Sequence, residues 1–448
     1  MLALRIRDFR LLWTGQLLSG LGSWLLVVAV PYKVFELTGS ALATGFTFIA
    51  ESLPALVIGP VAGVAADHWD RRRIMLAVNL GQAGCILPVA FVHRPGQVTI
   101  IYAALMAESV LGQLYEPAAQ ALVPSLVGRN EELTSANALI SVSSAMTRLA
   151  GASLGGVILA ALGLTSVVLI DIGTYLASAA CLALLHWRAV PRRDVPRRDV
   201  PRRDVPRRDV PRREAAGGGQ QRVAAGGGQQ RVAAGGGQQR AARSAVAELG
   251  QGLRHVVASR PLRGLLLAAV MFQIGNGAFT AVLVPYIRLR LHGTAGDVGF
   301  LIAATGAGFL VGAPLSRRLF YRVHLRILAG TSLLITAAAY VGWFSTSDLG
   351  GALTLAAVTG MSAMIFLVTR LTCLQRLTPG DLLGRTSSAF SAAEAGAGLI
   401  GLALGGMLAG LAGLTAAVSA AGLAIAGAAS LAAILLGGPL QARLATPR

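Results

Sequence analysis

The sequence predicts an all-helical integral membrane protein with twelve transmembrane helices, arranged as two six-helix halves that repeat each other in parallel. The first observation is composition, because 54% of the 448 residues are hydrophobic and the mean hydropathy is +0.64. Only 13% are charged, about half the fraction of an average soluble domain. The second is that the apolar residues gather in runs of about 20 residues, the length that crosses a bilayer. The third is the 55 glycines, which membrane helices use to pack closely.

Four segments follow from the distribution of these runs. Residues 1–187 form an N-terminal six-helix bundle, 188–243 a basic linker, 244–261 an amphipathic surface helix, and 262–448 a C-terminal six-helix bundle. The expected spans are 11–37, 41–66, 74–91, 98–122, 137–162, 164–187, 262–287, 296–315, 327–344, 351–374, 386–411 and 414–436.

The placement of basic residues predicts the orientation. With both termini in the cytoplasm, 33 Lys and Arg residues lie on the cytoplasmic side and four lie outside, namely Lys33, Arg94, Arg288 and Arg290. Without the linker the ratio is still 18 to four. Because cytoplasmic loops carry the excess of Lys and Arg, we expect a multi-pass protein of the plasma membrane with both termini cytoplasmic.

The linker is of low complexity and carries 15 arginines and five acidic residues. VPRRD occurs four times from Val190, and AAGGGQQR occurs three times from Ala215. A polybasic lipid-binding patch is one interpretation. Nucleic-acid binding is disfavoured because no aromatic residue is interleaved for stacking. We favour a neutral repeat expansion, which predicts that the linker is dispensable for folding and transport.

The segment after the linker, SAVAELGQGLRHVVAS, has a helical apolar pattern. Five residues fall on one face of that helix, namely Val246, Leu249, Leu253, Val256 and Val257. A helix with one apolar face and short length is expected to lie on the membrane surface, here just before the seventh span.

The two halves repeat each other at three places. The offsets between matching motifs are 249 to 250 residues for the first two pairs. The pairs are Gly63-x-x-x-Asp67 with Gly312-x-x-x-Ser316, Leu154-Gly155-Gly156 with Leu404-Gly405-Gly406, and Pro124…Gly128-Arg129 with Pro379…Gly384-Arg385. Three pairs in the same order indicate duplicated six-helix halves.

The charged turn GVAADHWDRRR at residues 63–73 joins the second and third spans. It resembles the signature loop of the major facilitator superfamily, G-x-x-x-D-x-x-G-R-R/K, through Gly63, Asp67, Arg71 and Arg72. Asp70 stands where the pattern has its second glycine. The resemblance implies a gating loop, in which Asp67 secures the second span against residues 385–388 when the carrier faces outward.

Residues 114–159 are similar to one branch of that superfamily, the enterobactin-exporter-like and macrolide-efflux-like carriers. Ala152 departs from that branch, which has proline there. The resemblance implies a secondary exporter of small molecules such as drug-like compounds, macrolides or siderophores. The residues that fit are Pro117, Ala118, Ala121, Pro124, Glu131 or Glu132, the run Ala136-Asn137-Ala138-Leu139, Arg148 and Gly151.

Several ionisable residues are expected inside the bilayer, where a charge needs a partner, a water-filled cavity or a proton. They are Glu51, Glu108, Glu116, Arg148, Asp171, Arg370 and Glu394. One interpretation is a polar cavity between the halves, in which the carboxylates exchange protons and bind cationic or polar groups of a substrate.

The alternative interpretation is structural, and it differs from residue to residue. A salt bridge of Arg148 with Glu108 or Glu116 could pin helices, and we weigh this evenly against a functional role. Glu51 and Glu394 have no partner nearby in the sequence, which favours function. Asp171 fits an interfacial residue whose side chain reaches toward water.

The remaining motifs exclude several classes. There is no G-x-x-x-x-G-K-[ST] loop, and Lys33 is the only lysine, so ATP-driven transport within this chain is not expected. The three cysteines have no metal-ligand spacing. We therefore expect a non-enzymatic, cofactor-free, monomeric carrier whose partners are protons, a small-molecule substrate and the lipid bilayer. A scaffold or sensor on the same fold, and an importer, remain alternatives.

Overall fold

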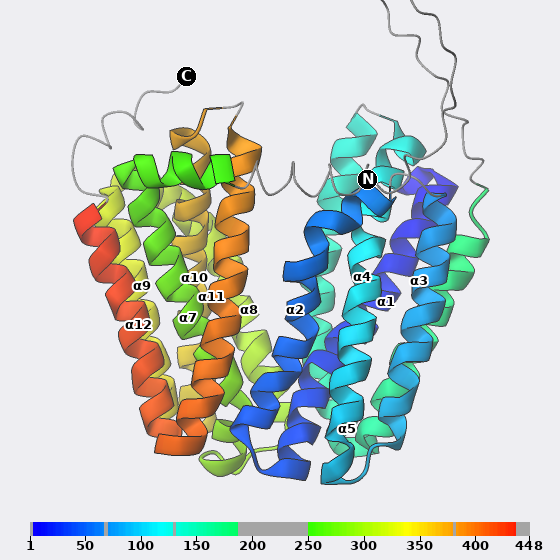
Figure 1. Cartoon of the computed structure of the whole chain (residues 1–448), viewed down its shortest axis with the longest axis horizontal. Coiled ribbons are helices and arrows are strands. Elements are labelled where there is room, and N and C mark those ends of the chain that lie inside the picture. Colours follow the sequence, from blue (N-terminus) through cyan, green and yellow to red (C-terminus); the bar gives the residue numbers. More distant parts are fainter. Residues whose placement is uncertain (1–2, 67–69, 129–130, 187–249, 380–381, 436–448) are drawn as a thin grey trace, which may run out of the picture.

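The apolar runs fold into long helices that stand side by side (Figure 1). The structure is a computed structural model of the whole chain, and it describes residues 3–66, 70–128, 131–186, 250–379 and 382–435. The long helices are α1 (Arg7–Thr38), α2 (Ala41–Ala66), α3 (Arg71–Ile86), α4 (Val98–Val127), α5 (Glu131–Ala183), α7 (Arg260–Leu289), α8 (Ala295–Arg322), α9 (Leu325–Ser345), α10 (Leu349–Leu377), α11 (Leu383–Ala412) and α12 (Leu414–Leu435).

Helix α5 contains two membrane spans. Its 53 residues would measure about 80 Å as one straight helix, far more than the roughly 30 Å hydrocarbon core. Gly163 breaks it with φ 78° and ψ 173°, a backbone conformation that a residue with a Cβ rarely adopts. The described residues hold eleven helices that qualify as spans by length and composition, and α5 counts twice. The prediction of twelve transmembrane helices is therefore confirmed.

The third span ends at Phe91, as expected, but its last turn is not α-helical. The α-helix stops at Ile86 and continues as a 3₁₀ turn over Leu87–Phe91. Pro88 explains the change, because its ring removes a backbone donor and crowds the preceding turn of an α-helix.

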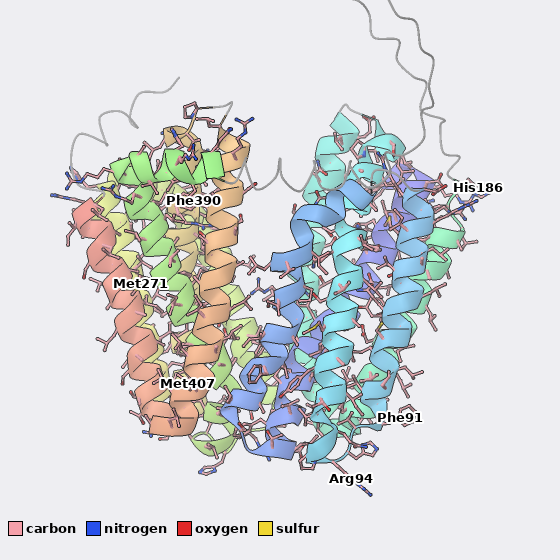
Figure 2. The ribbon with its side chains drawn as sticks, viewed as in Figure 1. Phe91, Arg94, His186, Met271, Phe390 and Met407 are labelled. Carbon is pink, nitrogen blue, oxygen red and sulfur yellow. The ribbon has the colours of Figure 1, made fainter. Side chains whose placement is uncertain are left out.

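The helices form two bundles, α1–α5 and α7–α12, with α1 beginning and α12 ending on the same side of the molecule, here called the terminal side (Figure 1). His186 lies at the terminal side, whereas Phe91 and Arg94 lie at the opposite side (Figure 2). The two bundles diverge toward the terminal side and meet toward the opposite side (Figure 1).

Glycines allow helices of the two halves to approach each other closely where the halves meet. A Cβ on Gly156 of α5 would overlap the Ala295 carbonyl of α8, and one on Gly299 of α8 would overlap the backbone of Ala152 and Ser153. On the other flank, α2 packs on α11 where Gly45 faces the Leu402 carbonyl. Arg288 Nη1 adds a hydrogen bond of 3.0 Å to the Tyr32 hydroxyl of the other half.

The charged turn after α2 is anchored to its own half. Asp70 caps α3, since its Oδ1 accepts a hydrogen bond from the Arg73 backbone N–H at 3.2 Å. Arg71 donates to the Ala121 carbonyl of α4 at 2.8 Å. Arg72 donates to the carbonyls of Leu182 and Ala183 at the end of α5, where Leu182 also accepts a hydrogen bond from the Leu185 backbone N–H at 3.3 Å. Asp67 lies outside the described residues, so the gating role stays a prediction.

The amphipathic segment is helical over residues 250–258 and lies across the terminal side of the C-terminal half (Figure 1). Val246 and Leu249 lie outside the described residues, so the expected apolar face stays a prediction. Val256 is fully buried and Gly252 packs on the Arg385 carbonyl, whereas Leu253 and Val257 are exposed. Arg385 also donates to Gln251 Oε1 at 2.9 Å. The buried face is therefore chosen by contact with α11, which the apolar pattern alone does not reveal.

Candidate functional site

A cavity of about 480 Å³ lies between the two halves. The N-terminal half contributes residues of α1, α2 and α5, and the C-terminal half contributes residues of α7, α8, α9 and α10. Most of the wall is apolar, and its aromatic members are Trp24, Phe48, Phe272, Phe279, Phe309, Tyr340 and Trp343. Polar groups interrupt it at few places, among them Asn276, whose Oδ1 accepts a hydrogen bond from Tyr340 at 2.8 Å. Such a wall suits a bulky organic molecule with a few polar groups.

Two charged residues line this central cavity, Glu51 of α2 and Arg148 of α5. The Arg148 guanidinium carbon lies 4.9 Å from the centroid of the Trp24 ring and 5.9 Å from that of Phe309. Because Phe309 belongs to α8, this cation–π contact joins the two halves. Among the described residues, neither Glu51 nor Arg148 has an oppositely charged partner within 4.0 Å.

The alternative of a salt bridge between Arg148 and Glu108 or Glu116 is not what the structure holds. Glu108 and Glu116 line two other cavities, both enclosed by residues of the N-terminal half. Residues at the same depth in the membrane make contact only if they lie on facing sides of their helices. Arg148 lies on the side of α5 that faces α8. Of the carboxylates expected in a cavity between the halves, Glu51 lines it, whereas Glu108 and Glu116 do not.

The second cavity, of about 310 Å³, contains both Glu51 and Glu108. Tyr175 Oη donates a hydrogen bond of 2.5 Å to Glu108 Oε1 and lies 3.1 Å from Ser23 Oγ. Ser109 Oγ donates to the Glu51 backbone carbonyl at 2.5 Å. Glu51 therefore faces both the central cavity and the cavity of Glu108.

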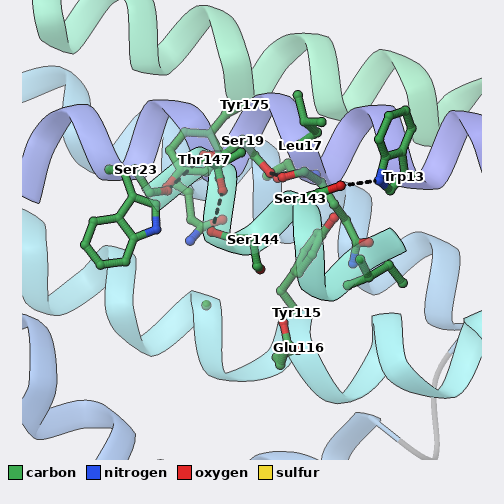
Figure 3. A pocket seen from close by; sticks show the side chains of 17 residues that line it. Trp13, Leu17, Ser19, Ser23, Tyr115, Glu116, Ser143, Ser144, Thr147 and Tyr175 are labelled. Atoms are coloured by element: carbon green, nitrogen blue, oxygen red, sulfur yellow. Dashed lines mark hydrogen bonds between the residues drawn. The ribbon is translucent and has the colours of Figure 1, made fainter. Parts of the chain in front are cut away.

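The third cavity, of about 250 Å³, lies among α1, α3, α4 and α5 and includes Glu116 (Figure 3). The exposed Glu116 carboxylate accepts a hydrogen bond of 2.9 Å from Gln120 Nε2. On the facing helices, Trp13 Nε1 donates to Ser143 Oγ at 2.8 Å. The wall is rich in hydroxyl and amide groups, in contrast to the aromatic wall of the central cavity.

Asp171 is enclosed by protein, and the expectation that its side chain reaches toward water is wrong. Its side chain is fully buried inside the N-terminal half, where a Cβ on Gly22 of α1 would overlap Asp171 Oδ1. Thr174 Oγ1 donates to the Asp171 carbonyl at 2.7 Å. The glycine admits the carboxyl group between α1 and α5, which the sequence does not reveal.

Arg370 and Glu394 form an ion pair between α10 and α11, and both side chains are largely buried. Glu394, which has no partner nearby in the sequence, thus has one in the structure. Proximity along the sequence could not reveal this partner, because Arg370 lies on the neighbouring helix α10. Unlike Glu51, Glu394 carries a charge that is already compensated.

Sequence reasoning missed Tyr175, Ser23 and the aromatic wall. A signal for Tyr175 existed, because it lies one helical turn after Asp171 and so on the same face of the span. The aromatic residues are spread over five helices, and their convergence is a property of the tertiary fold.

Comparison with known proteins identifies the family of the chain. A model of the Major Facilitator Superfamily matches residues 12–401. The chain belongs to this superfamily. As a Major Facilitator Superfamily transporter it is a multi-pass membrane protein and not an enzyme, and its substrate is a small molecule.

The transporter is similar to exporters along most of its length. It is 27% identical over 411 residues to "Uncharacterized MFS-type transporter YfiS" of Bacillus subtilis (strain 168), covering 89% of this chain and 86% of that protein. It is 25% identical to "Multidrug efflux pump Tap" of Mycolicibacterium fortuitum, covering 90% and 89%. It is 26% identical to "Enterobactin exporter EntS" of Citrobacter koseri, covering 89% and 85%. The resemblance to the exporter branch is thus confirmed.

The fold also agrees with a solved structure of the superfamily. A bacterial homologue of the iron transporter ferroportin, solved in an inward-facing state, superposes with a TM-score of 0.71 and 16% identity, covering 97% of this chain and 99% of that one. At this identity the likeness concerns the fold alone.

Proposed function

We propose that this transporter exports bulky, largely apolar organic molecules carrying a cationic or polar group, in exchange for protons. Drug-like compounds, macrolides and siderophores belong to this range of size. The observation that carries the proposal is the position of Glu51, which faces both the aromatic central cavity and the cavity of Glu108 without a described cation within 4.0 Å.

Glu51 couples substrate to proton because its carboxylate cannot bind a proton and a cationic substrate at the same time. When its carboxyl group is protonated, it has no charge with which to attract a cationic substrate. When a cation enters the central cavity, the ionised carboxylate is favoured and the proton leaves. Glu108 lies in the same second cavity. Repulsion between the two negative charges disfavours the state in which both carboxyl groups are ionised. Substrate and proton therefore compete for this pair.

The arrangement of the halves supports alternating access. They meet toward the opposite side and diverge toward the terminal side (Figure 1). With the termini in the cytoplasm, as the excess of basic residues predicts, this conformation loads substrate from the cytoplasm. A monomer in the plasma membrane is sufficient for this cycle, because the two halves of one chain enclose the central cavity between them.

The test is transport of ethidium and of radiolabelled erythromycin into inverted membrane vesicles under an imposed pH gradient. We expect Glu51→Gln to lower gradient-driven uptake at least about tenfold, and Glu108→Gln to lower it as well, because neither amide can carry the proton. The control is Glu36→Gln, which alters an exposed residue paired with Lys33 at the opposite side. Undiminished gradient-driven uptake in both cavity variants would make these carboxylates structural.

A further inference from the structure

The two cavities inside the N-terminal half adjoin each other. They share four residues, Ser23, Gln82, Gly112 and Tyr175. One extends along α1 from Trp13 to Trp24 and the other from Ser23 to Pro31. Together they form a polar corridor, defined here as the residues that line these two cavities. Every one of those residues belongs to the N-terminal half, whereas the central cavity is lined by both halves.

Tyr175 stands at the junction of the corridor. Its hydroxyl donates to Glu108 Oε1 at 2.5 Å on one side and lies 3.1 Å from Ser23 Oγ on the other. Gln82 is anchored beside it, because its Nε2 donates to the Glu108 backbone carbonyl at 3.3 Å. The Tyr175 ring is buried, so the hydroxyl is held in place between the two cavities.

The wall beyond Tyr175 offers polar groups that face the cavity without a protein partner. Asn79 is 1% exposed, and its amide nitrogen donates to Ser178 Oγ at 3.1 Å, yet its Oδ1 has no hydrogen-bond partner among the described residues. The same holds for Gln16 Oε1, which lines the same cavity. Buried polar groups of this kind are satisfied by water, and the volume of about 250 Å³ holds several molecules at roughly 30 Å³ each.

We propose that this corridor is the proton path of the transporter, in which water and the Tyr175 hydroxyl exchange protons between the terminal side and Glu108, apart from the substrate in the central cavity. The inference rests on the proposed proton-coupled export. It explains how a proton can leave while a bulky substrate occupies the central cavity. Tyr175 is a positioning and relay residue. The two paths meet at Glu51, beside Trp24 and Val27, which also line both the corridor and the central cavity.

The transfer needs no reactant other than protons and water. On protonation, the Tyr175 O–H bond breaks as its proton passes to Glu108 Oε1, while Oη takes a proton from a hydronium ion on the Ser23 side. The hydroxyl is regenerated, the hydronium ion becomes water, and the carboxylate becomes neutral. Release follows the reverse order. The titratable groups that interact with Glu108 in this environment are Glu51 on α2, Cys85 on α3, and Asp171 and Tyr175 on α5.

The experiment measures proton exchange directly and needs no substrate. Protons are released by a laser flash from a caged compound, and time-resolved infrared spectroscopy follows the carboxyl band that Glu108→Gln removes. We expect Tyr175→Phe, which keeps the ring and removes the hydroxyl, to slow protonation of Glu108 at least about tenfold. The matched control is Tyr286→Phe, because that buried hydroxyl donates to the Trp343 carbonyl at 2.7 Å and lines neither corridor cavity. The control should protonate Glu108 at the wild-type rate.

A second pair of variants tests the corridor by its volume. A Cβ on Gly112 would lie 3.4 Å from Gln82 Nε2 and point into the junction, so Gly112→Leu fills it. A Cβ on Gly173 of α5 would meet no atom within 4 Å, so Gly173→Leu adds the same side chain elsewhere. We expect only Gly112→Leu to slow protonation. Thermal unfolding of all four variants identifies any that are misfolded, and a folded variant of either pair is sufficient for the test.

The outcomes separate the two proposals. Wild-type rates in folded Tyr175→Phe and Gly112→Leu would overturn the corridor, because protons would then reach Glu108 through the central cavity. Slow protonation in these variants supports the corridor even if the vesicle experiment shows no proton-driven export. If transport by the wild-type protein in vesicles does not depend on the pH gradient, only the proposed function is overturned.

Discussion

Gly156 of α5 and Gly406 of α11, 250 residues apart, occupy matching positions in the two halves and have matching contacts. A Cβ on Gly156 would overlap the backbone of Ala295 in α8, and a Cβ on Gly406 would lie 3.0 Å from the Leu42 Cα in α2. Both contacts cross between the halves. The preceding glycines, Gly155 and Gly405, instead pack on α1 and α7 of their own half. The repeated Leu-Gly-Gly motif thus lets α5 and α11 each pack closely on two neighbouring helices.

Gly156→Leu should therefore open the opposite side of the molecule. Overpacking a tight contact costs about 1–3 kcal/mol, which shifts a two-state equilibrium by roughly 5- to 150-fold toward the conformation that lacks the contact. We expect a longer mean distance between spin labels at Glu36 and Arg290, two exposed positions near that side, measured by double electron–electron resonance. Gly173→Leu in the same helix is the control. An unchanged distance distribution in folded Gly156→Leu would mean that this contact does not hold the halves together.

The ion pair of Arg370 with Glu394 should stabilise the C-terminal half without carrying protons. Glu394→Gln leaves a largely buried guanidinium without its charged partner, and we expect a loss of about 1–3 kcal/mol in the free energy of unfolding. Replacing both residues with Leu and Met of similar size should restore much of that stability, because it removes both buried charges.

Transport separates this structural role from proton coupling. The double variant Arg370→Met/Glu394→Leu should keep gradient-driven uptake of ethidium, measured beside wild type in inverted vesicles. If it folds with near-native stability but loses its dependence on the pH gradient, Glu394 does carry the proton, as its sequence position first suggested.

These residues mark how far the sequence could predict the molecule. The membrane spans could be predicted from the length of the apolar runs, and the two halves from the repeated glycine motifs. Both signals are contained within a single helix and do not depend on how helices pack. The interpretation of Arg148, Asp171 and Glu394 was wrong or incomplete for one physical reason. A helix presents several faces, and which neighbour meets each face depends on packing. Hence Arg148 meets Phe309 rather than a carboxylate, and Glu394 meets Arg370.

Arg72 supplies the last prediction, and it concerns stability rather than gating. Its guanidinium donates to two carbonyls at the end of α5, at 2.8 Å to Leu182 and 2.5 Å to Ala183. Hydrogen bonds from a charged donor contribute about 1.5–3 kcal/mol each, and exposure of the second acceptor places the pair at the lower end. We expect Arg72→Gln to lower the free energy of unfolding by about 1–3 kcal/mol.

The neighbouring Arg73 offers the matched control for this effect. Its side chain is exposed, and only its backbone N–H contributes to the cap with Asp70. Arg73→Gln removes the same charge from the same turn but keeps that cap. Chemical unfolding in detergent, followed by tryptophan fluorescence, should therefore separate the two variants. Equal destabilisation would assign the effect to the charge of the turn and would contradict a specific role for Arg72 at the end of α5.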